Sequence, residues 1–280
     1  MLSRRGPLVV PGVYDALGAR IAEKAGFGAI FQTGYGTAAS LLGMPDYGFI
    51  GAAETVSNAR RICGAASVPV LVDADTGYGN ALSVWRLVGE LEAAGASGMF
   101  LEDQRWPKRC GHMGGKEVVP YEEYAEKLGA AVDARSSRDF VIVARTDARA
   151  TEGLDAAIER GIQNRKNGAD AVFIEAPASA EEMRIIGRSI RAPLVANMIE
   201  GGRTPTASAA TLDRMGFKLI LYPLSMLYAS SFAALRAMKE LKKKGSTKAL
   251  EGEMMEFDAF NDLVGLSRMA ELEGRYGRDK

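Results

Sequence analysis

The sequence predicts an α/β fold: a (β/α)8 barrel of the TIM type with additional helices after its last strand. Three observations carry this prediction. Eight short runs are apolar on both faces, as in the buried strands of parallel sheets. Helical stretches separate these runs, and several helices end at a glycine, which accepts the left-handed conformation that closes a helix. An open doubly wound sheet is the alternative, but no dinucleotide-binding glycine fingerprint follows the first run.

The expected strands and helices alternate along the chain. The strands are 8–13, 29–32, 69–73, 98–102, 140–145, 171–175, 193–197 and 218–222. The helices between them include 15–25, 81–94, 121–134, 154–167 and 180–190. Because the carboxyl ends of parallel barrel strands meet on one face, polar residues at those ends are the candidates for a functional site.

The chain turns strongly helical after the last expected strand, over 226–244 and 250–273. The second stretch is more apolar than a lone surface helix requires. Apolar residues at helical spacing usually pack into the core of a protein, but this stretch lies beyond the eighth strand. We therefore predict a single barrel domain over 1–280, in which 226–280 forms a helical extension used in oligomerisation.

Composition narrows the class of protein. The 280 residues carry a formal net charge of zero, so no bulk field draws the protein to nucleic acid or to a membrane surface. No apolar stretch is long enough to span a bilayer, and the N-terminus shows no signal-peptide pattern. Two cysteines cannot form a disulfide framework. We expect a soluble, cytoplasmic protein that binds neither nucleic acid nor membrane.

The segment Lys108-Arg109-Cys110-Gly111-His112 contains the only histidine and one of the two cysteines. Positive neighbours favour a thiolate, so Cys110 is predicted to ionise easily and to move protons or attack carbon. The alternative is a solvated basic loop with a chance cysteine. The other cysteine, Cys63, is interpreted as a packing residue at a helix end.

Carboxylates cluster where the third and fourth strands are expected to end. Asp73, Asp75 and Glu102 there would repel one another, and a divalent cation relieves such repulsion. Because all the ligands are oxygen, Mg²⁺ or Mn²⁺ is favoured over zinc. The alternative is structural ion pairing, which we favour for Asp103 and Asp147.

Arg145 ends the fifth strand, where its guanidinium can clamp a carboxylate in a bidentate fashion. A structural tie to Glu175, at the end of the sixth strand, is the alternative, and both can hold because arginine has five donors.

Several motifs resemble those of one known family. They are 11–16 (PGVYDA), 73–80 (DADTGYGN), 108–112 (KRCGH), 144–149 (ARTDAR), 196–198 (ANM) and 222–225 (YPLS). They are similar to the isocitrate lyase/phosphoenolpyruvate mutase superfamily over nearly the whole chain. The nearest branch contains 2-methylisocitrate lyases, 2,3-dimethylmalate lyases, oxaloacetate-processing members and carboxyphosphonoenolpyruvate phosphonomutases.

The resemblance implies an assembly and a metal. The last helix would be swapped between subunits, in a homotetramer built of dimers. Mg²⁺ would be held through Asp73 and Asp75, with Asp46 and Glu102 near its waters.

The resemblance also implies roles around a di- or tricarboxylate substrate. Lys108, Cys110 and His112 would ride on a loop that closes over the substrate, and Cys110 would protonate an enolate. Arg145 would act with them in catalysis. The substrate's carboxylates would be bound by Arg145, Glu175 and Asn197, and its keto-acid portion by the backbone of Thr33, Gly34 and Tyr35.

The implied activity is Mg²⁺-dependent cleavage of a carbon–carbon bond in a 2-hydroxy dicarboxylate, giving pyruvate or glyoxylate and a saturated acid. Two departures bear on the substrate. Phe31 stands where methylisocitrate lyases have a tyrosine, which leaves Tyr35 as one candidate for the base. Met226 follows YPLS where those enzymes usually have an arginine shortly afterwards, which argues against a third substrate carboxylate. The predicted substrate is therefore an alkylmalate such as 2,3-dimethylmalate.

Three alternatives stay open. One is a phosphonomutase of the carboxyphosphonoenolpyruvate or phosphoenolpyruvate type, which the segment 197–205 also resembles. The second is oxaloacetate decarboxylation or hydrolysis. The third is a non-catalytic barrel that binds acids or partners.

Overall fold

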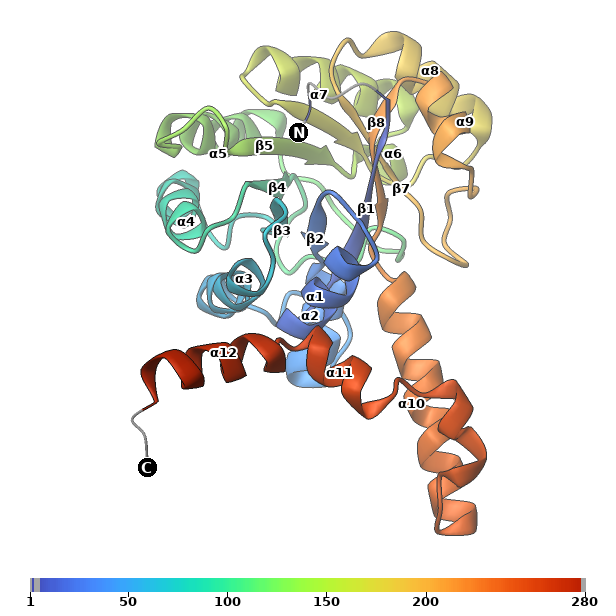
Figure 1. Ribbon diagram of the computed structural model, residues 1–280. Helices are drawn as coiled ribbons and strands as arrows, with labels where there is room; N and C mark the ends of the chain where they lie inside the picture. The colour runs from blue at the N-terminus through green and yellow to red at the C-terminus, as the bar shows by residue number, and fades with distance from the viewer. Residues whose placement is uncertain (1, 3–5, 278–280) are drawn as a thin grey trace. The chain divides into compact units, whose positions relative to one another are not determined.

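The computed structural model describes Leu2 and residues 6–277. Eight parallel strands close into one barrel in the order of the sequence, with helices around it, which confirms the predicted (β/α)8 fold (Figure 1). The strands are β1 (Leu8–Val13), β2 (Ile30–Gln32), β3 (Val70–Asp73), β4 (Gly98–Glu102), β5 (Val141–Thr146), β6 (Ala171–Ile174), β7 (Leu194–Asn197) and β8 (Phe217–Tyr222). The surrounding helices are α1 (Ala16–Lys24), α2 (Gly34–Leu42), α3 (Ala52–Ala65), α4 (Ala81–Ala93), α5 (Tyr121–Ala134), α6 (Ala148–Thr151), α7 (Leu154–Lys166), α8 (Ala180–Ser189) and α9 (Ala209–Arg214).

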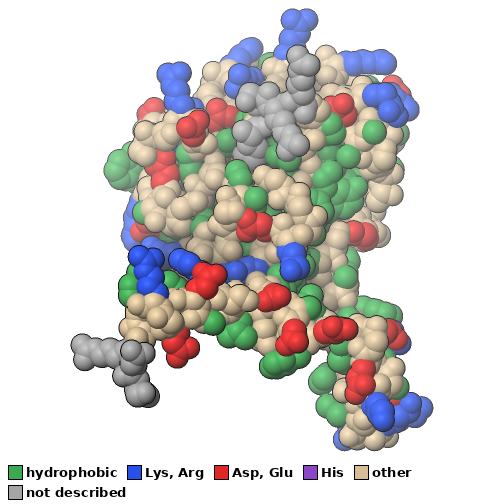
Figure 2. Space-filling view, viewed as in Figure 1, with side chains coloured by type: hydrophobic (Ala, Val, Ile, Leu, Met, Phe, Trp, Pro, Cys, Tyr) green, Lys and Arg blue, Asp and Glu red, His purple; other side chains and the backbone are tan. Residues whose placement is uncertain are grey.

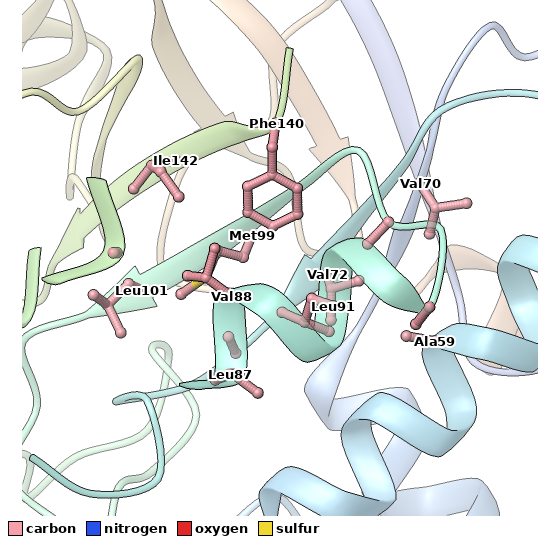
Figure 3. Close-up of a cluster of buried hydrophobic side chains, with 14 of the residues drawn as sticks. Ala59, Val70, Val72, Leu87, Val88, Leu91, Met99, Leu101, Phe140 and Ile142 are labelled. Carbon is pink, nitrogen blue, oxygen red and sulfur yellow. The ribbon is translucent and has the colours of Figure 1, made fainter. Parts of the chain in front are cut away.

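Apolar side chains seal the space between the strands and the helices that cover them. Figure 3 shows Leu87 and Leu91 of α4 among Val72 and Met99 of the neighbouring strands β3 and β4. All four side chains are nearly or fully buried. Each such side chain contributes about 1.5–3 kcal/mol relative to an exposed one, so this packing fixes where β3 and β4 end.

Three aromatic rings fill the barrel interior beneath its carboxyl-end rim. The rings of Phe31 and Phe100 lie 4.9 Å apart between centroids, and those of Phe100 and Phe173 lie 6.1 Å apart, both edge to face. The strand register places Glu102 beside Arg145 directly above this layer. The apolar floor therefore brings polar strand ends together on one face.

The chain divides into two compact units, Met1–Met226 and Leu227–Lys280. The second contains most of α10 (Ser225–Lys244), followed by η1 (Lys248–Glu253), α11 (Phe257–Leu263) and α12 (Leu266–Tyr276). The expectation of one helical stretch over 250–273 is wrong. Met254 is extended, and Gly265 takes a left-handed φ of 87° that ends the helix before it. Residues 278–280 of the predicted extension lie outside the described residues.

The C-terminal unit exposes many apolar side chains. Phe232, Leu235 and Met238 of α10 are 72%, 56% and 57% exposed, and Phe257 of α11 is 81% exposed. Apolar side chains lie among charged ones on the surface of this unit (Figure 2). Within residues 6–277, no helix is both long and apolar enough to cross a membrane.

Candidate active site

One small cavity at the carboxyl ends of the strands gathers most of the predicted site. Its volume is about 40 Å³, room for roughly three waters at 10–15 Å³ each. The predicted residues that line it are Thr33, Tyr35, Asp46, Asp73, Cys110, Arg145, Glu175 and Asn197. The others, Gly34, Asp75, Glu102, Lys108 and His112, do not line it but contact residues that do.

Carboxylates dominate one half of this rim. Nζ of Lys108 lies 2.6 Å from Oδ1 of Asp46 and 2.6 Å from Oδ1 of Asp75, and its side chain is 3% exposed. Burial opposes the charge of Lys108, but the carboxylates outweigh it and hold its pKa well above its usual range. Lys108 therefore lies deep in the acidic cluster and bridges two of its members.

The Asp73–Asp75 turn closes tightly against the start of α2. The amide of Gly34 donates to Oδ2 of Asp73 at 3.2 Å. A Cβ on Gly34 would lie 2.8 Å from that oxygen, so a larger residue here would displace the Asp73 carboxylate. Asp75 itself has a φ of 47°, in the left-handed region that a non-glycine residue seldom occupies.

The acidic half has more negative charge than its cations balance. Burial raises the pKa of Asp75 to about 7, although Lys108 opposes the rise. Burial likewise raises the pKa of Glu102 well above its usual range, and its Oε1 has no hydrogen-bond partner. Buried carboxylates that lack enough neighbouring positive charge are stabilised in their ionised form by an added cation. The oxygen-rich donor set therefore fits Mg²⁺ or Mn²⁺.

The acidic side chains are not arranged as a finished metal site. Across Leu2 and residues 6–277, no three His, Cys, Asp or Glu side chains converge on a point as metal ligands would. The physical reason lies in Lys108, whose ammonium group stands between Asp46 and Asp75. The metal set predicted from the sequence consequently stays a prediction.

The other half of the rim is built around Arg145. Its Nε donates to Oδ2 of Asp147 at 2.9 Å and its Nη2 to Oδ1 at 3.2 Å. Nη1 lies 3.2 Å from Oε2 of Glu102, and Nε lies 3.9 Å from Oε2 of Glu175. Nζ of Lys116 adds a contact of 2.6 Å to Asp147. Although burial opposes it, pairing with Arg145 and Lys116 lowers the pKa of Asp147 to about 2.

Structural pairing of Asp103 and Asp147, the alternative that the sequence favours, is confirmed. Asp147 pairs with Arg145 and Lys116, as described above. Asp103 accepts from Nη1 of Arg160 at 3.1 Å and from the amide of Asp147 at 2.8 Å. These two aspartates therefore hold the fifth strand end in place.

His112 joins the Cys110 loop to two other segments. Its Nε2 lies 3.1 Å from Oε1 of Glu175. Its Nδ1 accepts from the amide of Arg203 at 2.8 Å, so the proton of the neutral ring is on Nε2. Asn197 Nδ2 donates to Oε1 of the same glutamate at 3.3 Å. Although burial opposes it, Arg145 and His112 lower the pKa of Glu175.

Cys110 does not have the ionisation predicted from its neighbours. Burial raises the pKa of its thiol to about 11, and Asp46 and Glu175 add to the rise. The prediction of an easily formed thiolate is wrong chiefly because the thiol is buried. Lys108, one of the neighbouring cations in the chain, pairs with Asp46 and Asp75. At neutral pH the group is a thiol, which is able to donate a proton.

Tyr35 is a poor base for a similar reason. Partial burial, with Cys110 and Asp46 nearby, raises the pKa of its hydroxyl. The group is therefore protonated at neutral pH. The second cysteine, Cys63, packs in part against the core cluster and has a pKa of about 11 because of burial.

Sequence reasoning missed two parts of the site. The cavity is also lined by the apolar residues Phe100, Phe173, Ile199, Leu221, Pro223 and Leu224. Phe100, Phe173 and Leu221 lie on strands, and the other three follow β7 and β8, so their place in the cavity is evident only once the register is known. Lys116 was missed too, although a second lysine at the end of the glycine-rich loop was a readable signal.

Comparisons with known proteins agree with this geometry. The pattern of the family described as phosphoenolpyruvate phosphomutase matches residues 1–242. A chloroplastic carboxyvinyl-carboxyphosphonate phosphorylmutase of Arabidopsis thaliana is 48% identical over 280 residues, covering 99% of this chain and 83% of that protein. A 2,3-dimethylmalate lyase of Eubacterium barkeri is 45% identical over 276 residues, covering 99% and 96%.

A solved structure extends the likeness to three dimensions. The crystal structure of a 2,3-dimethylmalate lyase superposes with a TM-score of 0.92 at 38% identity, covering 97% of this chain and 91% of that chain. That protein is described as a member of the phosphoenolpyruvate mutase/isocitrate lyase superfamily. The chain studied here belongs to the phosphoenolpyruvate mutase family, within that superfamily.

Proposed function

We propose that this protein is a Mg²⁺-dependent carbon–carbon lyase that cleaves a 2-hydroxy dicarboxylate into a 2-keto acid and a saturated carboxylate. One observation carries the proposal: a protonated thiol, an arginine and an acidic cluster surround the same small cavity. The thiol is suited to protonating a carbanion, the arginine to binding a carboxylate and the acidic cluster to holding a cation.

The acidic half supplies the ligands for the metal in this proposal. Asp73 and Asp75 would hold Mg²⁺, with Asp46 and Glu102 beside it. When bound, Mg²⁺ supplies Lewis acidity toward an α-oxyacid. The unpartnered Oε1 of Glu102 and the raised pKa of Asp75 support this assignment.

The chain's own residues account for the remaining chemistry. The hydroxyl proton of the substrate leaves to a base, which releases it to water after the products have formed, and the C2–C3 bond breaks. Its electron pair moves to C3 as an enolate-like dianion, whose charge the guanidinium of Arg145 stabilises. The Cys110 thiol then gives its proton to C3, and the thiolate regains a proton from water. Arg145 and Asn197 bind the carboxylates, and Glu175, which His112 contacts, positions both of these side chains.

The loop that carries Cys110 is a lid in this account. A Cβ on Gly111 would lie 2.2 Å from Oε1 of Glu175 and 2.5 Å from Nη2 of Arg145, so the loop backbone lies directly on these side chains. The cavity beneath is too small for a substituted diacid to enter past it. The loop must move to admit substrate, and its return excludes water from the carbanion.

The apolar part of the cavity supports a substituted dicarboxylate over a tricarboxylate. Ile199, Leu221, Pro223 and Leu224 border this part, and none of them could pair with a third carboxylate. An alkyl group fits such a surface. For 2,3-dimethylmalate, cleavage between C2 and C3 gives pyruvate and propionate.

A phosphonomutase is the second candidate, because the Arabidopsis relative carries a phosphorylmutase name. Oxaloacetate decarboxylation or hydrolysis is the third. All three would use the same metal and Arg145, so the substrate decides between them.

We also propose that the exposed apolar side chains of the C-terminal unit pack on another subunit, with the last helix swapped in a homotetramer. The domain assignment over 1–280, with 226–280 as extension, and a cytoplasmic location likewise stay predictions.

A substrate panel tests the proposed function. The protein with Mg²⁺ is mixed in turn with 2,3-dimethylmalate, other alkylmalates, methylisocitrate, oxaloacetate and phosphonopyruvate. Keto-acid release is followed for the hydroxy acids, and loss of substrate and the products formed are followed by NMR for oxaloacetate and phosphonopyruvate. We expect an alkylmalate to give the highest kcat/KM, and EDTA to abolish it. Turnover of phosphonopyruvate alone would establish the second candidate instead, and turnover of no acid would refute the lyase.

A further inference from the structure

Lys116 fastens the far end of the Cys110 loop. Its side chain is 1% exposed. Its Nζ donates to the carbonyl oxygen of Gly111 at 2.5 Å and to Oδ1 of Asp147 at 2.6 Å. Because Gly111 directly follows Cys110, this lysine ties the backbone beside the thiol to a carboxylate at the end of β5.

Asp147 is also the carboxylate that grips Arg145 through both Nε and Nη2. The guanidinium further faces Glu102 and Glu175. One positive charge among three carboxylates has little net attraction for an anionic ligand. Lys116 is the second cation that contacts Asp147. It therefore offsets part of the negative charge beside the guanidinium of Arg145.

We infer that Lys116 is a positioning residue that links closure of the Cys110 loop to anion capture by Arg145. When the loop is shut, its ammonium group offsets the negative charge of Asp147 beside the guanidinium of Arg145, so that an incoming carboxylate meets less repulsion there. When the loop opens, the contact between Gly111 and Lys116 breaks. The nature of the anion, a small α-oxyacid, rests on the proposed function, whereas the hold on the loop does not.

A merely structural role must be distinguished from this one. Removing one partner of a buried ion pair destabilises a protein wherever the pair lies. Arg135 offers a matched control, since its Nη1 pairs with Oδ2 of Asp170 at 2.5 Å and neither residue borders the cavity. Arg135→Met therefore tests the loss of a cation–aspartate pair away from the loop.

Two measurements on the whole protein test the inference, neither of which needs turnover. The first is the rate at which iodoacetamide modifies Cys110, followed by peptide mass spectrometry without ligand. The second is the affinity for oxalate in the presence of Mg²⁺, measured by calorimetry. Loss of a charge-assisted hydrogen bond predicts a change of about tenfold or more in each for Lys116→Met, with faster alkylation and weaker binding.

The variants separate the outcomes. Lys116→Arg keeps the charge and is expected to lie closer to wild type than Lys116→Met in both measurements. Arg135→Met is expected to match wild type. A folded Lys116→Met protein with unchanged alkylation and unchanged oxalate affinity would overturn the inference, as would equal changes in Arg135→Met. If Lys116→Met does not fold, Lys116→Gln replaces it in the same comparison. Faster alkylation in a protein without lyase turnover would reject the proposed function alone.

Discussion

The two halves of the barrel rim differ in how completely their charges are paired. Around Arg145, Asp147 meets two cations and its pKa falls to about 2. Around Asp73 and Asp75, four carboxylates share Lys108, and the pKa of Asp75 rises to about 7. In the half around Arg145, which we call the complete half, Asp147 is paired with cations of the chain itself. The half around Asp73 and Asp75 has fewer cations than carboxylates.

We propose that this difference gives each half its own ligand. A paired, rigid arginine is prepared to bind a carboxylate without rearrangement, which is the property that a substrate anchor needs. Carboxylates that are costly to ionise together are instead stabilised by a divalent cation. Cys110 lines the same cavity as residues of both halves, so in the proposed function it reaches a ligand held by both. The variants below disturb this arrangement, from the largest expected effect to the smallest.

Replacing Cys110 removes the thiol that is proposed to protonate a ligand bound by both halves. Cys110→Ser is expected to lower kcat for alkylmalate cleavage by about 10²–10⁴-fold, since the weaker acid must protonate the carbanion. Cys63→Ser is the matched control because it removes the other thiol, which does not line the cavity. Steady-state keto-acid release measures both. Equal activity in the two variants would remove Cys110 from the mechanism.

Asp75→Ala acts on the half that lacks positive charge. We expect Mg²⁺ to raise the melting temperature of the wild type and to leave that of Asp75→Ala almost unchanged, because the proposed metal loses a ligand. Asp170→Ala removes a carboxylate that is paired with Arg135 away from the cavity, so it should keep the response to Mg²⁺. Scanning calorimetry with and without Mg²⁺ decides. A full Mg²⁺ response in Asp75→Ala would contradict the assignment.

Arg145→Lys acts on the complete half. Loss of bidentate binding is expected to raise KM for the diacid by about 10–100-fold, with a smaller effect on Mg²⁺ binding. Arg149→Lys provides the control, because Arg149 pairs with Glu182 and does not line the cavity. If Arg145→Lys weakened Mg²⁺ binding as much as diacid binding, the two halves would not be distinct.

Acid should weaken the complete half at low pH, where Asp147 becomes protonated. Asp147 has a folded-state pKa of about 2, below the value of about 3.9 for an unfolded aspartate. Its stabilising contribution is therefore present above about pH 4 and is lost as the pH falls toward 2. The difference corresponds to about 2–3 kcal/mol. In urea unfolding between pH 6 and pH 3, Asp147→Asn should show a shallower loss of stability than wild type. Parallel curves would show that Asp147 does not contribute.

The sequence predicted the barrel because its signals are local. Apolar runs such as 98–102 and glycines such as Gly95 mark strands and helix ends without knowledge of the rest of the fold. The strand ends then placed Asp73, Arg145 and Asn197 on one face, and all three line the cavity.

What the sequence could not show depends on burial and on long-range pairing. Cys110 has cations beside it in the chain, yet burial raises its pKa, and Lys108 pairs with Asp46 and Asp75. Lys116 and Asp147 are 31 residues apart in sequence and meet only in the folded barrel. Neighbours in the chain are therefore a poor guide to neighbours in the site.

The most direct test of the two-half rim is the affinity of the wild-type protein for oxalate, measured by calorimetry with Mg²⁺ and again with EDTA. In the proposed site oxalate would contact both Arg145 and a metal held by the acidic cluster, so both halves would have to act together. We expect binding in Mg²⁺ to be tighter by about 100-fold or more, because without the metal the acidic half repels the dianion. Equal affinity in Mg²⁺ and in EDTA would contradict the account.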